Sequence, residues 1–366
     1  MNTVNNLFEQ ITDKNNIGLA IQNAAKGKRK KESVNRILKN TFIHAEALSS
    51  RLKSGEWRPE RIHKVHTIND GISLKKREIV CPRFLNELVV NHAIFQVCKP
   101  IFMKRFYKYS CASVPGRGVE YAIKHIRKAA KDRKNTKYFS VIDIYHFFDS
   151  VKPSKVFHQL RRIIRDRKTL MLFAHILRGN KVDSPSNGIT KRGMPIGFYS
   201  SQWLANLLLT PLDNMIKANG IKYYYRYNDD MLLFCSNKRK LKKVIGLIES
   251  FLQSISLSVK RPPQIHCFSK VPIRYIGAII YPHKVILQEK VFLKACRTAR
   301  RIGRKKRMTI YDARKMLSYS SKFSHYDTYK AYHEKLEANV PRKKCRVLIS
   351  NYERRKRLCG ISQTQT

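Results

Sequence analysis

The sequence is poor in acidic residues. Its 366 residues include 25 Asp and Glu against 75 Lys and Arg, which gives a formal net charge of +50. An excess of this size is larger than solubility requires. It implies a polyanionic partner, with nucleic acid as the first candidate and a membrane surface as the weaker one. Hydrophobic residues still make up 43% of the chain, so a packed core is expected.

Other absences exclude whole classes of protein. The eight cysteines are scattered and none forms a Cys-x-x-Cys pair, which argues against a zinc site or a disulfide framework and fits a reducing cytoplasm. No apolar run reaches about 18 residues, so no spanning helix is expected. The first residues lack the apolar core of a secretory signal. We therefore expect a cytoplasmic protein without a membrane partner.

Periodicity predicts a mixture of helices and short strands. Apolar residues between 34 and 52 recur at helical spacing within a basic N-terminal region. Residues 61–80 predict a hairpin with Asn-Asp-Gly at 69–71 as its turn. From about residue 288 the pattern is helical and densely basic. Between these regions we expect helices at about 83–106, 119–131, 153–178, 198–218 and 238–254, a polar loop at 181–192 and short strands at 257–283.

The most informative motif is Tyr-Asn-Asp-Asp at 227–230, inside the apolar and aromatic stretch 223–234. Two adjacent carboxylates between buried strands are costly unless a cation compensates their charge. Asp143 ends a second apolar strand, and carboxylates that meet from separate strands suit Mg²⁺. Two such ions, about 3.5–4 Å apart, are the polymerase arrangement. Taken alone, the Asp-Asp pair could be a solvated turn and Asp143 a strand-end cap.

The order of these blocks resembles a reverse transcriptase. Residues 143–150 resemble the first catalytic block and residues 227–230 the Tyr-x-Asp-Asp block, and the resemblance covers about 60–285. It implies an α+β right-hand polymerase fold with fingers, an antiparallel-sheet palm and a helical thumb. The expected parts are a basic helical N-terminal region at 1–60, fingers and palm at 61–286, and a basic helical thumb and tail at 287–366.

The block between them narrows the resemblance. Ile-Gly-Phe-Tyr-Ser-Ser-Gln at 196–202 resembles the Ile-Gly-x-x-x-Ser-Gln of diversity-generating retroelements, where most bacterial reverse transcriptases carry Gln-Gly-x-x-x-Ser-Pro. Residues 111–118 are similar to another block of that group. The resemblance implies a bacterial or phage-encoded enzyme that copies template RNA into cDNA with errors opposite adenine. It also implies Mg²⁺, with Mn²⁺ as a substitute, deoxynucleoside triphosphates, an RNA–DNA duplex and a small basic pentameric accessory protein.

The resemblance also assigns roles to single residues. Asp143, Asp229 and Asp230 would be the catalytic residues and would hold two Mg²⁺ ions. Phe148 matches the aromatic gate that leaves no room for a 2′-hydroxyl, and its alternative is an ordinary core phenylalanine. Arg77 resembles the arginine that clamps the incoming triphosphate, and its alternative is general surface charge.

The middle block and the later blocks would complete the site. Gly197 would let the backbone approach the templating base or the nucleotide. Ile196 stands where other classes have glutamine, which we link to poor base discrimination. Lys260 would protonate the leaving pyrophosphate. Asn228 departs from the usual Met or Val, and we expect it to alter fidelity or sugar selection. Nucleotide contacts are also expected from Ile144 and Gln202, and template or primer contacts from Ile196, Ser201, Asn228, Tyr275, Ile276 and Gly277.

Three alternatives remain open at this point. The first is a reverse transcriptase of another class, such as a retron or group II intron enzyme. The second is an RNA-dependent RNA polymerase, in which Asp149 would read the 2′-hydroxyl, although Phe148 favours DNA synthesis. The third is a catalytically silent nucleic-acid-binding scaffold, which the net charge alone would fit and the three carboxylates argue against.

Overall fold

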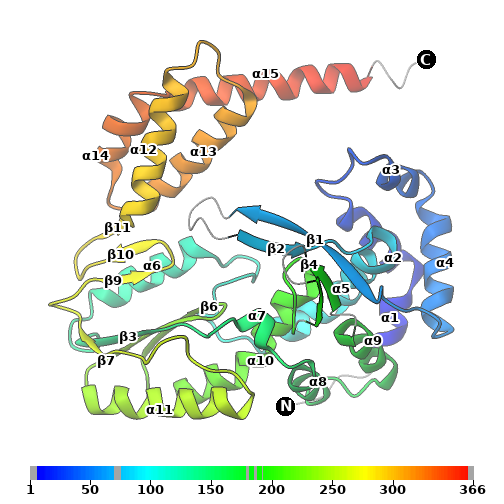
Figure 1. Ribbon diagram of the computed structural model, residues 1–366, viewed down its shortest axis with the longest axis horizontal. Coiled ribbons are helices and arrows are strands. Elements are labelled where there is room, and N and C mark those ends of the chain that lie inside the picture. The colour runs from blue at the N-terminus through cyan, green and yellow to red at the C-terminus, as the bar shows by residue number, and fades with distance from the viewer. Residues whose placement is uncertain (1–5, 70–75, 179–180, 185–187, 192, 362–366) are drawn as a thin grey trace. The chain divides into compact units, whose positions relative to one another are not determined.

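The computed structural model describes residues 6–69, 76–178, 181–184, 188–191 and 193–361 (Figure 1). The chain divides into two compact units. The first comprises Met1–Gly118 and Ser140–Ile265, and the second Val119–Phe139 and His266–Thr366. The second unit thus combines a short internal segment with the C-terminal region, while the predicted division at residues 60 and 286 stays a prediction.

Four helices open the first unit, as the basic N-terminal pattern predicts. They are α1 (Leu7–Thr12), α2 (Lys14–Ala24), α3 (Glu32–Lys39) and α4 (Thr41–Lys53). The apolar pattern at 34–52 is divided between α3 and α4, because Asn40 between them leaves helical geometry (φ −118°, ψ 41°). Helix α2 packs on α4 and on α5 (Val90–Met103), which follows the π-helical turn η1 (Phe84–Val89).

A four-stranded sheet, in the order β2-β1-β4-β5, contains the predicted hairpin. Strands β1 (Ile62–Asn69) and β2 (Lys76–Val80) pair antiparallel, whereas Asp70 and Gly71 of the predicted turn lie outside the described residues. The prediction of a polar loop at 181–192 is wrong. This segment contains the hairpin strands β4 (Lys181–Ser184) and β5 (Gly188–Lys191), and β4 pairs parallel with β1. Only Val182 supplies a clear buried apolar side chain in β4, so the composition concealed the strand.

A second sheet carries the Asp-Asp motif. Strands β6 (Tyr223–Tyr227) and β7 (Asp230–Cys235) form an antiparallel hairpin, and β3 (Tyr138–Ile142) lies beside β7. The helices α10 (Tyr199–Ala218) and α11 (Lys238–Ser254) pack together, and α11 also packs on β7 (Figure 1). The remaining helices of the first unit are α7 (Phe147–Ser150), α8 (Pro153–Arg161) and α9 (Arg167–Arg178). The helix predicted at 153–178 is therefore interrupted between α8 and α9.

The second unit joins short strands to a helical C-terminal region. Residues Tyr138 and Phe139 of β3 pair antiparallel with β8 (His266–Cys267). Helix α6 (Val119–Ala130) is tied to this unit because Arg127 forms an ion pair with Asp327. A capping box starts α13 (Ile310–Ser324), with Thr309 and Asp312 exchanging hydrogen bonds. The other elements are β9 (Ile273–Tyr275), β10 (Ala278–Ile280), β11 (Val285–Leu287), α12 (Glu289–Gly303), α13 (Ile310–Ser324), α14 (Tyr329–Tyr332), η2 (His333–Glu337) and α15 (Arg342–Ile361).

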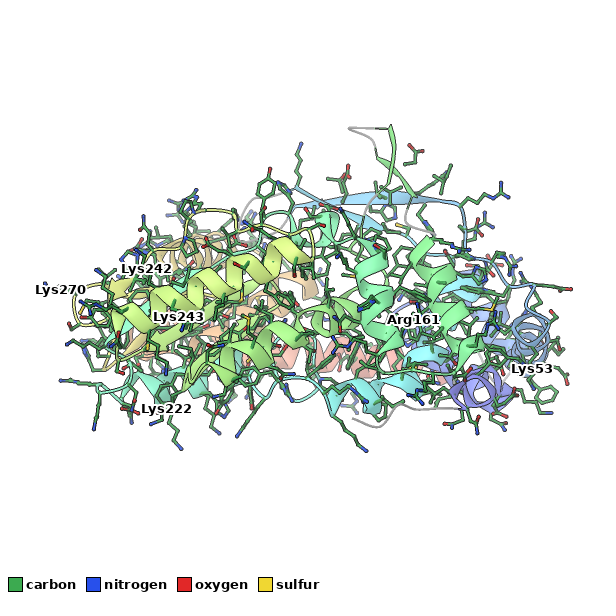
Figure 2. The ribbon with its side chains drawn as sticks, turned by 90° about the horizontal axis from the view of Figure 1, so that it is seen from below. Lys53, Arg161, Lys222, Lys242, Lys243 and Lys270 are labelled. Carbon is green, nitrogen blue, oxygen red and sulfur yellow. The ribbon has the colours of Figure 1, made fainter. Side chains whose placement is uncertain are left out.

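These elements confirm the predicted α+β class, with an antiparallel hairpin sheet backed by helices and a helical C-terminal region. Basic side chains cover much of the helical surface. Figure 2 shows Lys242 and Lys243 extending from α11, and Arg161 at the end of α8. Within the described ranges, no helix has the length and apolar character needed to cross a membrane.

Candidate active site

The tip of the β6–β7 hairpin presents the central motif. Tyr227 pairs with Asp230, which leaves Asn228 and Asp229 as a two-residue turn. Asn228 has a φ of 53°, a left-handed conformation that asparagine adopts more readily than most residues. The departure from Met or Val therefore has a local structural reason, because asparagine tolerates the left-handed conformation better than methionine or the β-branched valine. The proposed effect on fidelity or sugar choice stays a prediction.

One ammonium group, that of Lys260, interacts with the predicted carboxylates. Asp143 follows β3, and its carboxylate forms an ion pair with the Nζ of Lys260. The ammonium also interacts electrostatically with Asp229 and Asp230. A backbone hydrogen bond from the amide of Lys260 to the carbonyl of Asp143 (2.8 Å) holds the two segments together. Carboxylates from two separate segments therefore influence one ammonium group, and their predicted role as metal ligands stays a prediction.

The electrostatics of the site favour bound positive charge. Burial raises the pKa of Asp229, the negative charge of Asp143 raises this pKa further, and Lys260 and Arg77 oppose both effects. The hydrogen bond to Asp143 raises the pKa of Lys260 in turn, so this side chain stays protonated at neutral pH. A second carboxylate charge near Asp229 is costly, and a cation between the two relieves that cost.

The donor set fits a hard divalent cation. In the part of the chain that the structure describes, no group of three or more His, Cys, Asp or Glu side chains is already arranged as a metal site. The ammonium of Lys260 instead occupies the position of the counter-ion. The oxygens of Asp143 and Asp229 are the ligand type that Mg²⁺ and Mn²⁺ take. Asp143 and Asp229 would hold such an ion, with Asp230 beside them.

A cleft of about 720 Å³ lies in front of these carboxylates. Its volume falls in the range of small-molecule sites. Arg77 from β2 and the half-buried Phe148 from α7 line it, so the predicted triphosphate clamp and sugar gate share one cavity. His146, which precedes α7, has a φ of 39°, a strained conformation typical of functional sites. The predicted residues that line the cleft are Arg77, Asp143, Ile144, Phe148, Ile196, Asp229 and Lys260.

The other residues of the middle block contact protein in this structure. A Cβ on Gly197 would lie 2.3 Å from the carbonyl oxygen of Val80, so this glycine is required by its close approach to β2. Ser201 is buried and donates a hydrogen bond to the carbonyl of Pro195 (2.8 Å). Their expected contacts with nucleotide or template stay predictions.

Gln202 joins the two blocks on which the narrower resemblance depends. Its Oε1 accepts a hydrogen bond from the hydroxyl of Ser113 (2.6 Å), and Ser113 has a φ of 57°. Residues 111–118 and 196–202 therefore meet in space. The predicted contact of Gln202 with the nucleotide stays a prediction.

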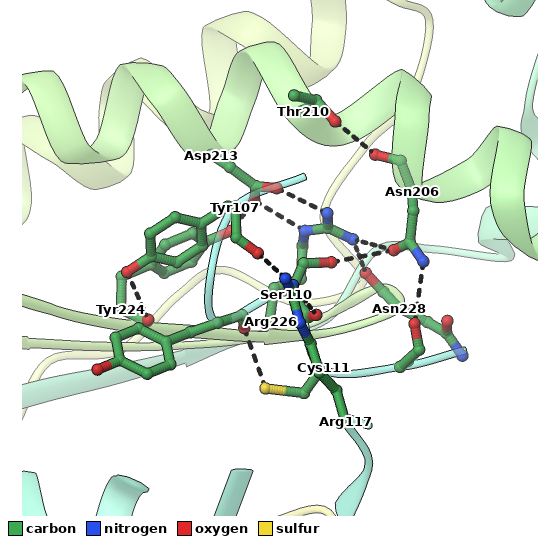
Figure 3. A network of polar contacts seen from close by, with 12 residues as sticks. Tyr107, Ser110, Cys111, Arg117, Asn206, Thr210, Asp213, Tyr224, Arg226 and Asn228 are labelled. Carbon is green, nitrogen blue, oxygen red and sulfur yellow. Dashed lines mark hydrogen bonds and ion pairs between the residues drawn. The ribbon is translucent and has the colours of Figure 1, made fainter. Parts of the chain in front are cut away.

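Sequence reasoning missed a buried network behind the turn of Asn228 and Asp229 (Figure 3). The guanidinium of Arg226 is fully buried and donates to both carboxylate oxygens of Asp213 (2.8 and 2.7 Å). Its Nη1 donates to Asn206 Oδ1 (2.9 Å) and to the carbonyl of Asn228 (3.0 Å). Arg226 thus fixes the backbone of the turn that presents Asp229. An arginine inside the apolar run Tyr-Tyr-Tyr-Arg-Tyr was the available signal, because a buried charge requires a partner.

The residues predicted to grip the primer lie in the second unit. Tyr275 pairs with Ala278, so Ile276 and Gly277 form the two-residue turn between β9 and β10. Their φ angles are 42° and 82°. Two left-handed residues are normal in such a turn, but isoleucine is a strained choice where asparagine is preferred. Strain of this kind points to a functional constraint on the side chain, and the primer contact itself stays a prediction.

We expect Ile276→Asn to raise the free energy of unfolding by about 1 kcal/mol, since it relieves the cost of a β-branched residue in a left-handed conformation. Urea unfolding of the full chain measures the change. Ile276→Val is the matched control, because it keeps the branched side chain and should change stability little. A loss of stability in the asparagine variant would show that contacts of Ile276 outweigh its backbone strain.

Comparison with known proteins assigns the family. Residues 75–280, more than half of the chain, match the family described as reverse transcriptase (RNA-dependent DNA polymerase). The chain belongs to this family. The matched region contains Arg77, Asp143, Asp229 and Lys260 of the cleft.

Individual relatives are distant. Protein YkfC of Escherichia coli (strain K12) is 24% identical over 192 residues, which is 50% of this chain and 50% of that protein. The putative COX1/OXI3 intron 1 protein of Saccharomyces cerevisiae is 19% identical over 291 residues, 64% of this chain and 34% of that protein. The chain therefore spans half or less of the length of these curated relatives.

The solved structures that resemble this chain include telomerases. Apo telomerase from Candida tropicalis has a TM-score of 0.47 at 12% identity, over 75% of this chain and 58% of that chain. Telomerase from Candida albicans, in complex with a fragment of telomeric RNA, has a TM-score of 0.46 at 13% identity, over 78% and 56% of the two chains. Because both scores are below 0.5, the family assignment depends on the sequence match alone.

Proposed function

We propose that this chain is an RNA-directed DNA polymerase that extends a primer on an RNA template. The observation that carries the proposal is one cleft that Asp143 and Asp229 line together with Arg77 and Phe148. Lys260 also lines this cleft and forms an ion pair with Asp143. Nucleotidyl transfer needs an arrangement of this kind, because carboxylates held at one point retain divalent cations beside a bound triphosphate.

The residues of the cleft have distinct tasks. When bound, Mg²⁺ would lower the pKa of the primer hydroxyl and neutralise the triphosphate. Arg77 would bind phosphate oxygens through its guanidinium, and Phe148 would lie under the sugar. Lys260 would leave Asp143 as the divalent cation enters. Its ammonium would then be free to protonate the departing pyrophosphate, a task suited to a side chain that is protonated at neutral pH.

We further propose the diversity-generating class, with frequent errors opposite adenine. The hydrogen bond between Ser113 and Gln202 supports this narrower proposal, since it joins the two blocks that resemble that group. Ile196 lines the cleft with an apolar side chain where a polar one would discriminate bases by hydrogen bonds. The proposed partners are a template RNA and a small basic pentameric accessory protein, in the cytoplasm of a bacterium or phage-infected cell.

A second candidate is an intron-type reverse transcriptase. The name of the yeast relative, a putative intron 1 protein, favours this alternative. The two candidates share their chemistry and differ in error spectrum, so the sequence of the product separates them.

Primer extension with sequenced products tests the proposal. The full chain would be given a defined RNA template, an annealed DNA primer, Mg²⁺ and the four deoxynucleoside triphosphates. Extension with errors concentrated opposite adenine would support both parts of the proposal. Faithful extension would leave a reverse transcriptase and overturn the diversity-generating class. An inactive chain, even with a candidate accessory protein and its cognate RNA, would favour the silent scaffold.

We expect Phe148→Ala to increase incorporation of ribonucleotides relative to deoxynucleotides by at least about tenfold, because removing the ring opens space for a 2′-hydroxyl. A tenfold change corresponds to about 1.4 kcal/mol in the difference between the activation free energies for the two nucleotides. Single-nucleotide addition with paired ribo- and deoxynucleotides measures the ratio. Phe173→Leu is the control, since Phe173 is a buried phenylalanine of α9 that does not line the cleft. An unchanged ratio in Phe148→Ala would show that Phe148 is an ordinary core phenylalanine and not a sugar gate.

A further inference from the structure

The second unit contains its own cavity of about 420 Å³. It lies among three segments, which are the loop before β3, the turn after β8 and the turn after β10. None of its lining residues lines the catalytic cleft, and none is acidic. Its lining residues include Arg133, Lys137, Phe268, Lys270, Tyr281 and His283.

The walls of this cavity combine cations with rings. Arg133, Lys137 and Lys270 are exposed (Lys270 is labelled in Figure 2). The ammonium of Lys137 lies 5.7 Å from the centroid of the Tyr138 ring. Tyr281 is half-buried, and its ring centroid lies 6.3 Å from that of His283 at an interplanar angle of 37°. The ammonium of Lys284 lies over the Tyr281 ring, 5.2 Å from its centroid, and leaves the other face for a base. Phe268 is buried and supplies an apolar surface. Cations next to flat rings bind phosphate and base together.

Backbone hydrogen bonds hold the walls in place. The amide of Phe268 donates to the carbonyl of Lys137 (3.0 Å), which joins the first two segments. The amide of Lys270 donates to the carbonyl of Cys267 (3.1 Å) and closes the turn after β8. The amide of Tyr281 donates to the carbonyl of Lys284 (2.8 Å) and closes the third segment. The rings are therefore carried on ordered backbone, and little conformational entropy is lost when a ligand binds.

We propose that this cavity binds one nucleotide of single-stranded RNA outside the catalytic cleft. The base would stack on the Tyr281 and His283 rings, and Lys137 and Lys270 would contact the adjoining phosphates. The volume suits one nucleotide rather than a duplex, and a cavity without carboxylates does not repel the phosphate. The inference rests on the proposed function only in taking RNA as the partner of this chain.

The test is photo-crosslinking of the full chain to a single-stranded RNA of about twelve nucleotides, a length typical of single-strand sites, that carries one 4-thiouridine. Peptide mapping should place crosslinks on Tyr281 or His283. Tyr281→Ala should weaken binding about tenfold in fluorescence anisotropy, since one stacked base is lost. Tyr281→Phe keeps the ring and should retain the affinity, which separates stacking from misfolding.

Charge is tested separately. Lys270→Ala should lower the dependence of log Kd on log salt by about 0.7, the value for one phosphate contact on a single strand. Lys134→Ala is the matched control, because Lys134 is an exposed lysine in the same loop and does not line the cavity. It should leave the crosslinks at Tyr281 unchanged.

The outcomes separate this proposal from the proposed function. Crosslinks at the cavity in a chain that makes no DNA would support the RNA site and contradict the proposed polymerase activity. The opposite outcome is a chain that extends a short annealed primer but forms crosslinks only outside the cavity, while Tyr281→Ala keeps wild-type affinity. This outcome would overturn the RNA site and leave the polymerase proposal intact. Displacement of the RNA by an equal concentration of free ATP would also overturn it, in favour of a mononucleotide site.

Discussion

Asp229→Asn is expected to reduce primer extension by at least about a thousandfold while making the folded chain more stable. The loss follows because a divalent cation contributes several kcal/mol to the transition state and each 1.4 kcal/mol is a factor of ten. The gain follows because burial and Asp143 raise the pKa of Asp229, so the ionised carboxylate destabilises the fold at neutral pH. Extension assays and thermal unfolding measure the two effects.

The gain in stability should depend on pH in a defined direction. A carboxyl whose folded pKa is raised contributes stability at low pH and loses it as pH rises through the folded value. The difference between Asp229→Asn and the natural chain should therefore be present at pH 7 and vanish below about pH 4, the ordinary pKa of aspartate. Glu249→Gln on α11, outside the cleft, is the control for loss of one negative charge. A less stable Asp229→Asn at pH 7 would contradict the electrostatic account.

Arg226→Met is expected to lower the free energy of unfolding by about 3–5 kcal/mol, because it leaves the buried Asp213 without its ionic partner. Urea unfolding measures the change. The double variant with Asp213→Leu removes both charges, and should recover most of the lost stability. If Arg226→Met alone lowers the free energy of unfolding by less than about 1 kcal/mol, the ion pair contributes no more than a surface pair does.

The same double variant separates the contribution of Arg226 to stability from its role in holding the turn in place. Arg226 also donates to the carbonyl of Asn228, and no restored packing replaces that hydrogen bond. The double variant should therefore fold but extend primers more slowly than the natural chain. Full activity in a stable double variant would show that the turn holds its shape without Arg226.

The sequence predicted those features whose signals are local. The hairpin at 223–235 was visible because apolar runs flank the carboxylates, and Asp143 because it ends a strand. Features that depend on distant partners were missed. Arg226 and Asp213 come from a strand and a helix, and Gly197 approaches Val80 from another part of the chain. The β4–β5 hairpin was concealed by its polar composition, since β4 gains its hydrogen bonds from β1.

The ion pair between Lys260 and Asp143 gives the acidic cleft an internal counter-ion. The Asp143 carboxylate therefore has a cationic partner within the chain itself. A divalent cation that bound here would have to replace this tethered ammonium, so binding would be an exchange of cations. The protein without a bound metal in this way avoids an uncompensated negative charge at the cleft. The compensating positive charge belongs to a side chain of the protein and does not come from an ion in solution.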